Sequence, residues 1–122
     1  KEVHFAGVSF TYSSGQVPAV QGLDLVIAKG QSVAFVGPSG AGKTTLISLA
    51  SRFYDVQPGR GSILVDGHDI RDVTRNSLVR QMSMVLQEPY LFSATVRENI
   101  RYNHPQVTDE EIVSLNAALE IP

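Results

Sequence analysis

The sequence predicts an α/β domain with a partly parallel sheet, and three observations lead to this prediction. Strand-sized apolar segments alternate with segments whose apolar residues recur at helical spacing. One strand-sized segment, residues 33–36, is apolar without alternation, which is typical of a strand covered on both faces. A glycine-rich stretch, residues 37–42, then leads into a helical segment, as in the strand–turn–helix units of α/β domains.

The N-terminal residues 1–31 predict a mainly antiparallel β subdomain. The stretch "VHFAGVSFTY" is rich in β-branched and aromatic residues, and "LDLVIAKG" places Leu23, Leu25 and Ile27 at alternate positions. Between these strands, "YSSGQ" is followed by a Val-Pro pair. Because a proline disfavours helical geometry at the residue before it, we expect a hairpin loop there.

The elements after the glycine-rich stretch follow from spacing and turn residues. Apolar residues at helical spacing run through "KTTLISLASRFY" to Phe53, and a Pro-Gly pair ends this helix. "SILVDG" predicts a short strand that closes in a turn at Asp66. "NSLVRQM" predicts a short helix, and "MSMVL" a second buried strand. In "TDEEIVSLNAAL", Thr108 and Glu111 have capping-box spacing ahead of a helix.

Composition limits the classes of protein that the chain can represent. With 122 residues, of which 43% are hydrophobic, we expect one modest core and one domain. The net charge of −2, from 10 basic and 12 acidic residues, argues against a nucleic-acid partner. There is no cysteine, which excludes disulfides and cysteine-based zinc sites. No apolar run approaches the ~20 residues that cross a bilayer, so any membrane connection should come through a partner.

The strongest motif is Gly37-x-x-x-x-Gly42-Lys43-Thr44, which matches the Walker A pattern of phosphate loops. Glycines let backbone N–H groups face phosphate oxygens, and the helix that follows directs its positive end at them. Lys43 would neutralise the β- and γ-phosphates, and the Thr44 hydroxyl would ligate Mg²⁺. The predicted phosphate-contacting residues are Gly37, Pro38, Ser39, Gly40, Ala41, Gly42, Lys43, Thr44 and Thr45. The alternative is a glycine-rich turn beside a solvated lysine.

Three stretches around this loop resemble the nucleotide-binding domain of ATP-binding cassette (ABC) transporters. They are "VSFTY", "GSILVDGHDI" and "MSMVLQEPYLFSATVRENI", and the resemblance runs from about Val3 to the last residue, closest to the exporter type. It implies a P-loop NTPase (RecA-like) core with an N-terminal antiparallel β subdomain. On this scheme residues 32–88 are a core portion with a β insert, and residues 89–122 begin a helical subdomain in which the chain ends. The implied cofactors are ATP and Mg²⁺.

The resemblance also implies roles for residues outside the loop. Tyr12 matches the aromatic residue that stacks on adenine, although without the resemblance it reads as an ordinary strand aromatic. Gln87 matches the catalytic glutamine that touches Mg²⁺ and the attacking water, although alone it reads as a solvated loop residue. Tyr90 to Phe92 match the segment that meets the transmembrane partner, although an apolar triplet is also typical of plain core.

Two further stretches look like family motifs in the wrong place. "YSSGQ" is similar to the signature loop, but that loop follows the glutamine in the family and opens a helix. "ILVD", which ends at Asp66, is similar to a Walker B strand with its magnesium-binding aspartate. The glycine that follows makes Asp66 more typical of a turn than of a metal ligand.

The function expected from the resemblance is ATP binding and hydrolysis coupled to export, at the cytoplasmic face of a membrane, in a head-to-tail dimer of nucleotide-binding domains. The signature loop, Walker B strand and catalytic glutamate do not occur between Gln87 and Pro122. We therefore expect the chain alone to bind nucleotide weakly with negligible turnover. Two alternatives stay open: a non-catalytic docking module for a transmembrane partner, and part of a soluble cassette ATPase.

Overall fold

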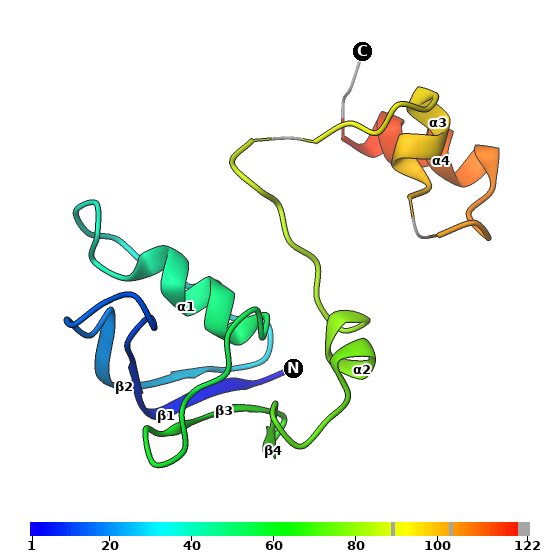
Figure 1. The fold of residues 1–122 in the computed structure, drawn as a ribbon. Helices are drawn as coiled ribbons and strands as arrows, with labels where there is room; N and C mark the ends of the chain where they lie inside the picture. The colour runs from blue at the N-terminus through cyan, green and yellow to red at the C-terminus, as the bar shows by residue number, and fades with distance from the viewer. Residues whose placement is uncertain (89, 103, 120–122) are drawn as a thin grey trace. The chain divides into compact units, whose positions relative to one another are not determined.

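The structure is a computed structural model, and it describes residues 1–88, 90–102 and 104–119. The chain divides into two units, residues 1–83 and residues 84–122. Figure 1 shows a sheet with helices α1 and α2 in the first unit, and helices α3 and α4 in the second.

The first unit is built on a four-stranded sheet with the strand order β2-β1-β3-β4 and antiparallel pairing throughout. Its strands are β1 (Val3–Phe10), β2 (Val20–Ile27), β3 (Ser62–Val65) and β4 (His68–Asp69). In the register, Phe5 of β1 lies opposite both Leu25 of β2 and Ile63 of β3. The predicted antiparallel pair, joined by a hairpin loop that contains residues 12–16, is therefore confirmed.

An irregularity in β1 brings three of its side chains to the buried face. Phe5 and Val8 are three positions apart, so strict alternation would place them on opposite faces. The register with β2 shifts between these two residues, and Gly7 in that stretch has a φ of 58°. The shift returns Val8 to the core side. Phe5, Val8 and Phe10 are consequently all 5% exposed or less.

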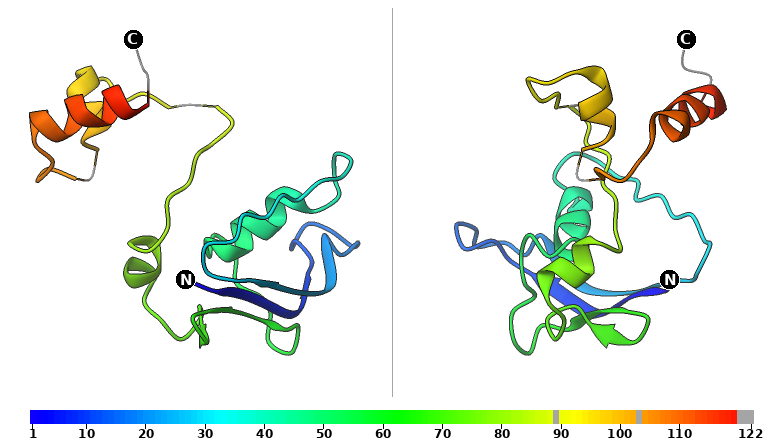
Figure 2. Two further views of the ribbon diagram at one scale, coloured as in Figure 1. Left: turned by 180° about the vertical axis from the view of Figure 1, so that it is seen from behind. Right: turned by 90° about the vertical axis from the view of Figure 1, so that its right-hand side faces the viewer.

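Helix α1 (Lys43–Ala50) lies over one face of this sheet (Figures 1 and 2). The short helix α2 (Arg75–Val79), which Thr74 caps, was also predicted. Side chains from the sheet and both helices form one core: Phe5, Val8, Phe10, Leu46, Leu49, Val56, Ile63, Ile70 and Leu78. Burial of such a side chain contributes about 1.5–3 kcal/mol. The core therefore fixes α1 on the sheet, and with it the loop that enters α1.

Helix α1 is shorter than the sequence pattern predicts. It ends at Ala50, and Phe53 is 63% exposed, so the prediction that Phe53 lies on its apolar face is wrong. The cause is Arg52, whose φ of 55° is left-handed and cannot continue a right-handed helix. Its guanidinium donates to the carbonyl oxygens of Ile70 and Val73 at 2.7 and 2.8 Å. These hydrogen bonds hold the backbone of Arg52 in its left-handed conformation. The spacing of apolar residues in the sequence gives no sign of this conformation.

The turn between β3 and β4 confirms the turn prediction for Asp66. Asp66 and Gly67 have φ values of 49° and 81°, and a tight two-residue hairpin needs positive φ at both positions. The Asp66 carboxylate accepts a hydrogen bond from the Glu2 N–H at 2.8 Å and lies 3.8 Å from Lys1 Nζ. Among the described residues, no three His, Asp or Glu side chains form a group that could hold a metal ion.

Two predicted strands are not formed in the described structure. Residues 33–36 and 82–86 lie outside the sheet, and Val36 and Val85 are 89% and 98% exposed. A strand needs neighbours that pair with its backbone N–H and C=O groups. Within the described ranges, no backbone–backbone hydrogen bond reaches residues 33–36 or 83–86. The prediction of a partly parallel sheet is therefore wrong for these residues.

The second unit contains α3 (Val96–Ile100) and α4 (Asp109–Ala118), and each helix begins with a capping box. In α4 the box pairs Thr108 with Glu111, as predicted. In α3 it pairs Thr95 with Glu98. The hydrogen bonds that Glu98 accepts from the Thr95 N–H and hydroxyl lower the pKa of its carboxyl group. The α3 helix was missed, although Thr95 and Glu98 have the same spacing as the predicted box.

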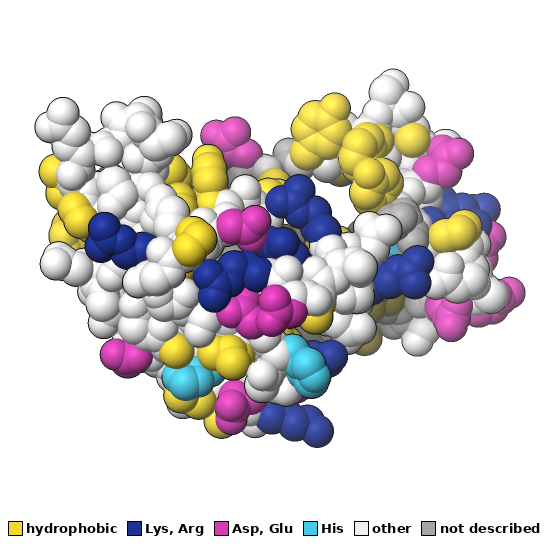
Figure 3. Space-filling view, turned by 60° about the horizontal axis from the view of Figure 1, so that its bottom comes forward, with side chains coloured by type: hydrophobic (Ala, Val, Ile, Leu, Met, Phe, Trp, Pro, Cys, Tyr) yellow, Lys and Arg dark blue, Asp and Glu magenta, His cyan; other side chains and the backbone are white. Residues whose placement is uncertain are grey.

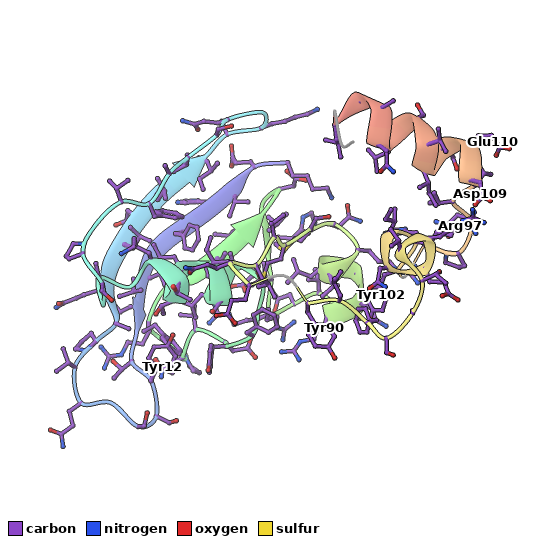
Figure 4. The ribbon with its side chains drawn as sticks, turned by 90° about the horizontal axis from the view of Figure 1, so that it is seen from above. Tyr12, Tyr90, Arg97, Tyr102, Asp109 and Glu110 are labelled. Carbon is purple, nitrogen blue, oxygen red and sulfur yellow. The ribbon has the colours of Figure 1, made fainter. Side chains whose placement is uncertain are left out.

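Asp109, the first residue of α4, is paired with arginines near both ends of α3. Its carboxylate pairs with Arg97 at 3.0 Å and also with Arg101, and Figure 4 shows Arg97 of α3 beside Asp109 of α4. Ile112 is the buried residue of α4, whereas Leu115, three positions further along the helix, is 51% exposed. Of the helices in the described part of the chain, none combines the length and the apolar character that a bilayer crossing requires.

Charged side chains of both signs are interleaved on the face that Figure 3 shows. In the first unit, Arg71 and Asp69 form an ion pair, with Nη2 and Oδ2 2.6 Å apart and Nε and Oδ1 3.0 Å apart. Arg71 also donates to the carbonyl oxygen of Val56 at 3.2 Å. The side-chain hydrogen bonds from Arg71 hold the pKa of Asp69 below its ordinary value. The pair thus ties the end of β4 to the segment that follows α1.

Asp69→Asn is expected to lower the free energy of unfolding by about 1 kcal/mol at neutral pH. The pKa of Asp69 is lower in the folded state than in the unfolded state. Its contribution to the free energy of unfolding is therefore complete above the unfolded pKa of about 4, and it is lost as the pH falls through the folded pKa. Urea unfolding between about pH 2 and pH 7 measures the difference between the two proteins, which should shrink below about pH 4. The control is Asp72→Asn, a neighbouring exposed carboxylate. A difference that stays constant down to the lowest pH would contradict the prediction.

Candidate functional site

The glycine-rich loop, residues 37–42, ends directly on the N-terminus of α1 (Figure 1). Gly40 and Gly42 have φ values of 81° and 86°, which side chains other than glycine rarely adopt. The Ala41 N–H donates to the carbonyl oxygen of Pro38 at 3.2 Å. Helix α1 begins at Lys43. The loop therefore leads into the helix end whose first N–H groups have no partner within the helix.

The loop is seated on the connection between β1 and β2. A Cβ atom at Gly42 would lie 2.3 Å from the carbonyl oxygen of Ala19, so only glycine permits this approach. Ala19 is itself held by the hydrogen bond from its N–H to the carbonyl oxygen of Phe10, at 2.8 Å. The position of the loop is thus set by a residue that lies 23 positions earlier in the sequence than Gly42.

Lys43 points back across the loop from the first turn of α1. Its Nζ donates to the carbonyl oxygens of Gly37 and Pro38 at 2.7 and 2.6 Å. These partners are neutral carbonyl groups, so they do not compensate the positive charge of the ammonium group beside the loop. Phosphate oxygens would attract that charge more strongly than the carbonyl oxygens do, because they carry negative charge themselves and add a direct attraction between opposite charges.

A pocket of about 480 Å³ opens beside the loop. Its lining residues come from the β1–β2 connection, the loop and α1: Tyr12, Ala19, Ser39, Gly40, Gly42, Lys43, Thr44 and Thr45. The set contains one ammonium group and no carboxylate, so its electrostatic preference is for an anion. The volume lies within the range of about 300–1,000 Å³ that is usual for small-molecule sites.

The two threonines of the motif differ in exposure. Thr44 is exposed, so its hydroxyl is open to a ligand or a metal ion. Thr45 is 5% exposed, and its Oγ1 lies 2.9 Å from the hydroxyl oxygen of Tyr12. A hydroxyl group has one proton to donate and two lone pairs. Thr45 can therefore bond to Tyr12 and still engage a further group in the pocket.

Tyr12 lies just beyond β1 at the edge of the pocket, where Figure 4 labels it. Its ring packs against Phe10 at a centroid distance of 5.0 Å and against Tyr54 at 5.2 Å, in both cases edge to face. The Gly15 N–H donates to the Tyr12 carbonyl oxygen at 2.9 Å within the hairpin loop. Both the backbone and the ring of Tyr12 are thus held in place.

Most of the predicted site residues lie in or beside this pocket. Gly37 and Pro38 do not line it, but they supply the carbonyl oxygens that Lys43 contacts. Sequence reasoning missed two residues of the site, Ala19, which lines the pocket, and Tyr54, which packs on Tyr12. Nothing in their local sequence marks them, because their contacts depend on how distant segments fold together.

The remaining predicted residues belong to the second unit, where Gln87 is exposed. In the predicted partner segment, Tyr90, Leu91 and Phe92 are 75%, 77% and 41% exposed. Phe92 stacks on the ring of Tyr102 at 4.3 Å. This packing covers one side of Phe92 and leaves most of the other two side chains open to a partner. The roles of Gln87 and of this segment remain predictions.

Comparison with known proteins identifies the family. The family model described as "ABC transporter" matches residues 20–121. An uncharacterized ABC transporter ATP-binding protein of Bacillus subtilis, YfiC, is 48% identical over 110 residues. A Staphylococcus aureus protein, provisionally named as a multidrug export ATP-binding/permease protein, is 51% identical over 106 residues. A solved bacterial Atm1-family ABC exporter with ATP bound has a TM-score of 0.88 at 38% identity.

The matches cover most of this chain but a small part of each relative. They include 90% and 87% of the chain in the two sequence relatives and 98% in the solved exporter. The chain spans about 18% of the length of each sequence relative and 21% of the exporter chain. The likeness therefore extends over the loop, the sheet and the second unit alike.

Proposed function

The chain belongs to the ABC transporter family, and from this premise we propose that it is the ATP-binding portion of a nucleotide-binding domain of the exporter type. The observation that carries the proposal is the pocket beside the loop, which combines a helix N-terminus, one lysine and an aromatic ring with no carboxylate. Such a pocket suits a ligand with an anionic end and a planar end. The solved relative with ATP bound supports ATP as that ligand.

Each residue of the loop has a role in holding the triphosphate. The backbone N–H groups of residues 39, 40 and 42–45 point their dipoles at the phosphate oxygens, whereas the Ala41 N–H, which donates to the Pro38 carbonyl oxygen, helps to hold the shape of the loop. Lys43 exchanges its two carbonyl partners for β- and γ-phosphate oxygens, and the Thr45 hydroxyl donates to another phosphate oxygen while it accepts from Tyr12. The Tyr12 ring stacks on adenine, a contact worth about 1–3 kcal/mol per base.

Magnesium, when bound with ATP, neutralises phosphate charge and orients the terminal phosphate. The residues present fit this ion in part, because the exposed Thr44 hydroxyl offers the neutral oxygen ligand that Mg²⁺ accepts alongside phosphates and water. Gln87 is proposed to touch Mg²⁺ and the attacking water through its side-chain amide, which accepts from water without adding charge. We propose that the chain by itself binds nucleotide weakly and hydrolyses it negligibly.

The remaining roles concern the whole protein, of which the chain spans about a fifth if its length is that of the relatives. We propose that ATP binding and hydrolysis drive export across a membrane, with this domain at the cytoplasmic face. Residues 90–92 would contact the transmembrane domain, because their side chains are exposed and apolar. A second nucleotide-binding domain would pair with the first head to tail.

Tyr12→Ala is expected to weaken binding of Mg-ATP about tenfold or more, whereas binding of inorganic triphosphate should change much less. The reason is that the substitution removes the surface for adenine but keeps the loop and Lys43. Titration calorimetry, or nuclear magnetic resonance titration at low affinity, measures both dissociation constants. Equal losses for the two ligands would show that Tyr12 does not contact the base. Absence of ATP binding by the unaltered chain would contradict the proposed function itself.

A further inference from the structure

Tyr12 belongs to a cluster of three aromatic rings at the edge of the pocket. Phe10 and Tyr12 lie 5.0 Å apart between centroids with an interplanar angle of 85°. Tyr12 and Tyr54 lie 5.2 Å apart at 89°, and Phe10 and Tyr54 lie 5.6 Å apart at 50°. Every ring therefore contacts the other two. Edge-to-face pairs of this kind are worth about 0.5–1.5 kcal/mol beyond the area they bury.

The three rings have different surroundings. Phe10 is 5% exposed and belongs to the core, so it forms the fixed base of the cluster. Tyr54 is 47% exposed and comes from the segment after α1, more than forty positions from Tyr12 in the sequence. Tyr54 makes no hydrogen bond with its hydroxyl group among the described residues. Its contacts in the site are therefore those of its ring with the other two aromatic rings.

These contacts restrain Tyr12 at three points. Phe10 and Tyr54 contact its ring, and Thr45 bonds its hydroxyl oxygen at 2.9 Å. A tyrosine side chain has two rotatable bonds that orient its ring, so three contacts are enough to fix that orientation. Neither aromatic neighbour stacks parallel to Tyr12. A planar base would stack parallel to the Tyr12 ring. Phe10 and Tyr54 do not occupy that stacking geometry, because they contact Tyr12 edge to face.

We propose that Tyr54 is a positioning residue that holds the Tyr12 ring in the orientation needed to stack on the base of a bound nucleotide. The proposal rests on the proposed function and goes beyond it by assigning selectivity for a base to a residue that does not line the pocket. A site whose supporting side chains are fixed in advance loses less conformational freedom on binding. Tyr54 would thus favour ligands that carry a planar base over inorganic triphosphate.

A purely structural role for Tyr54 makes a different prediction. If Tyr54 only stabilised the fold, its loss would lower the melting temperature and weaken all ligands of the loop equally. A positioning role instead changes the ratio of two dissociation constants, that for inorganic triphosphate divided by that for Mg-ATP. A general loss of folded protein changes both dissociation constants by the same factor, because both ligands are measured on the same preparation. Such a loss therefore leaves the ratio unchanged.

The experiment compares this ratio in the unaltered chain with that in Tyr54→Leu, Tyr54→Phe and Phe53→Leu. Tyr54→Leu should reduce the ratio about three- to tenfold, because it removes one edge-to-face contact with Tyr12. Tyr54→Phe keeps the ring and should restore the ratio. Phe53→Leu is the matched control, since Phe53 is 63% exposed in the same turn and makes no ring contact with Tyr12 among the described residues. Melting curves confirm that each variant is folded.

A double-mutant cycle then tests whether Tyr54 acts through Tyr12. In a Tyr12→Leu background, Tyr54→Leu should leave the ratio unchanged, because the ring that it positions is gone. An unchanged ratio in the single variant Tyr54→Leu, additive losses in the cycle, or a Tyr54→Phe variant as poor as Tyr54→Leu would each overturn the proposal. If Tyr12→Leu itself leaves the ratio unchanged, the adenine site fails and the positioning role fails with it.

Discussion

Lys43→Ala is expected to abolish measurable binding of ATP and of inorganic triphosphate alike. The lysine supplies the only ammonium group among the residues that line the pocket, and its Nζ already lies at the mouth of the loop, 2.7 and 2.6 Å from two carbonyl oxygens. On binding, these neutral partners are exchanged for phosphate oxygens, and the gain comes from the charge of the new partners. Loss of a charged hydrogen-bond partner costs about 1.5–3 kcal/mol, or more where the ligand itself is charged.

The same substitution should leave the fold nearly intact. The carbonyl groups of Gly37 and Pro38 lie in an exposed loop and can bond to water once Lys43 is removed. Calorimetry measures the loss of binding, and thermal melting measures stability, which we expect to change little. Lys29→Ala, at an exposed lysine of the same unit, is the matched control and should bind as the unaltered chain does. A dissociation constant that does not change in Lys43→Ala would reject this loop as the phosphate site.

Gly42→Ala is expected to destabilise the first unit by about 3 kcal/mol or more and to disrupt the pocket. Two costs add at this position. The φ of 86° is left-handed, which costs a residue with a Cβ about 1–2 kcal/mol. The new Cβ would also lie 2.3 Å from the carbonyl oxygen of Ala19, which is backbone that cannot rotate away. Relief would require the loop to move off the connection between β1 and β2, which breaks the wall of the pocket.

Gly40→Ala separates these two costs. Gly40 has nearly the same φ, 81°, but a Cβ there would meet no atom within 4 Å. It should therefore carry the left-handed strain without the collision, and lose about 1–2 kcal/mol. Urea unfolding of both variants gives the difference, which isolates the contact with Ala19. Equal free energies of unfolding for the two variants would show that the loop is not seated on Ala19.

The conformation of the glycine-rich loop could be predicted from sequence because the residues that determine it lie close together in the chain. The glycines, Lys43 and the helix that follows fall within a few positions of one another, so the pattern and the geometry coincide. The role proposed for Tyr12 came from the resemblance instead. Its contact with Thr45 crosses 33 positions, and its contact with Tyr54 depends on how the chain turns after α1. Contacts of this kind are set by tertiary packing, which spacing does not record.

The errors have physical causes as well. The apolar residues 33–36 led to the prediction of a buried strand, but apolar character does not tell whether a strand finds an edge to pair with. Helix α1 stops at Ala50 because Arg52 bonds to distant carbonyl groups, although the apolar spacing continues to Phe53. Helix α3 is five residues long, too short for periodicity to register, and only its capping box marked it.

Asn99 of α3 has a consequence for the chemical durability of the turn that precedes that helix. Its side-chain oxygen accepts from the Phe92 N–H at 2.8 Å, and its side-chain nitrogen donates to the carbonyl oxygens of Phe92, Ala94 and Thr95 at 3.1, 3.3 and 2.9 Å. The primary amide of asparagine offers both kinds of partner in one planar group. Hydrolysis of this amide to the carboxylate of aspartate would barely alter its shape. It would, however, place a negatively charged oxygen next to three carbonyl oxygens, and the repulsion would break the hydrogen bonds that hold the turn.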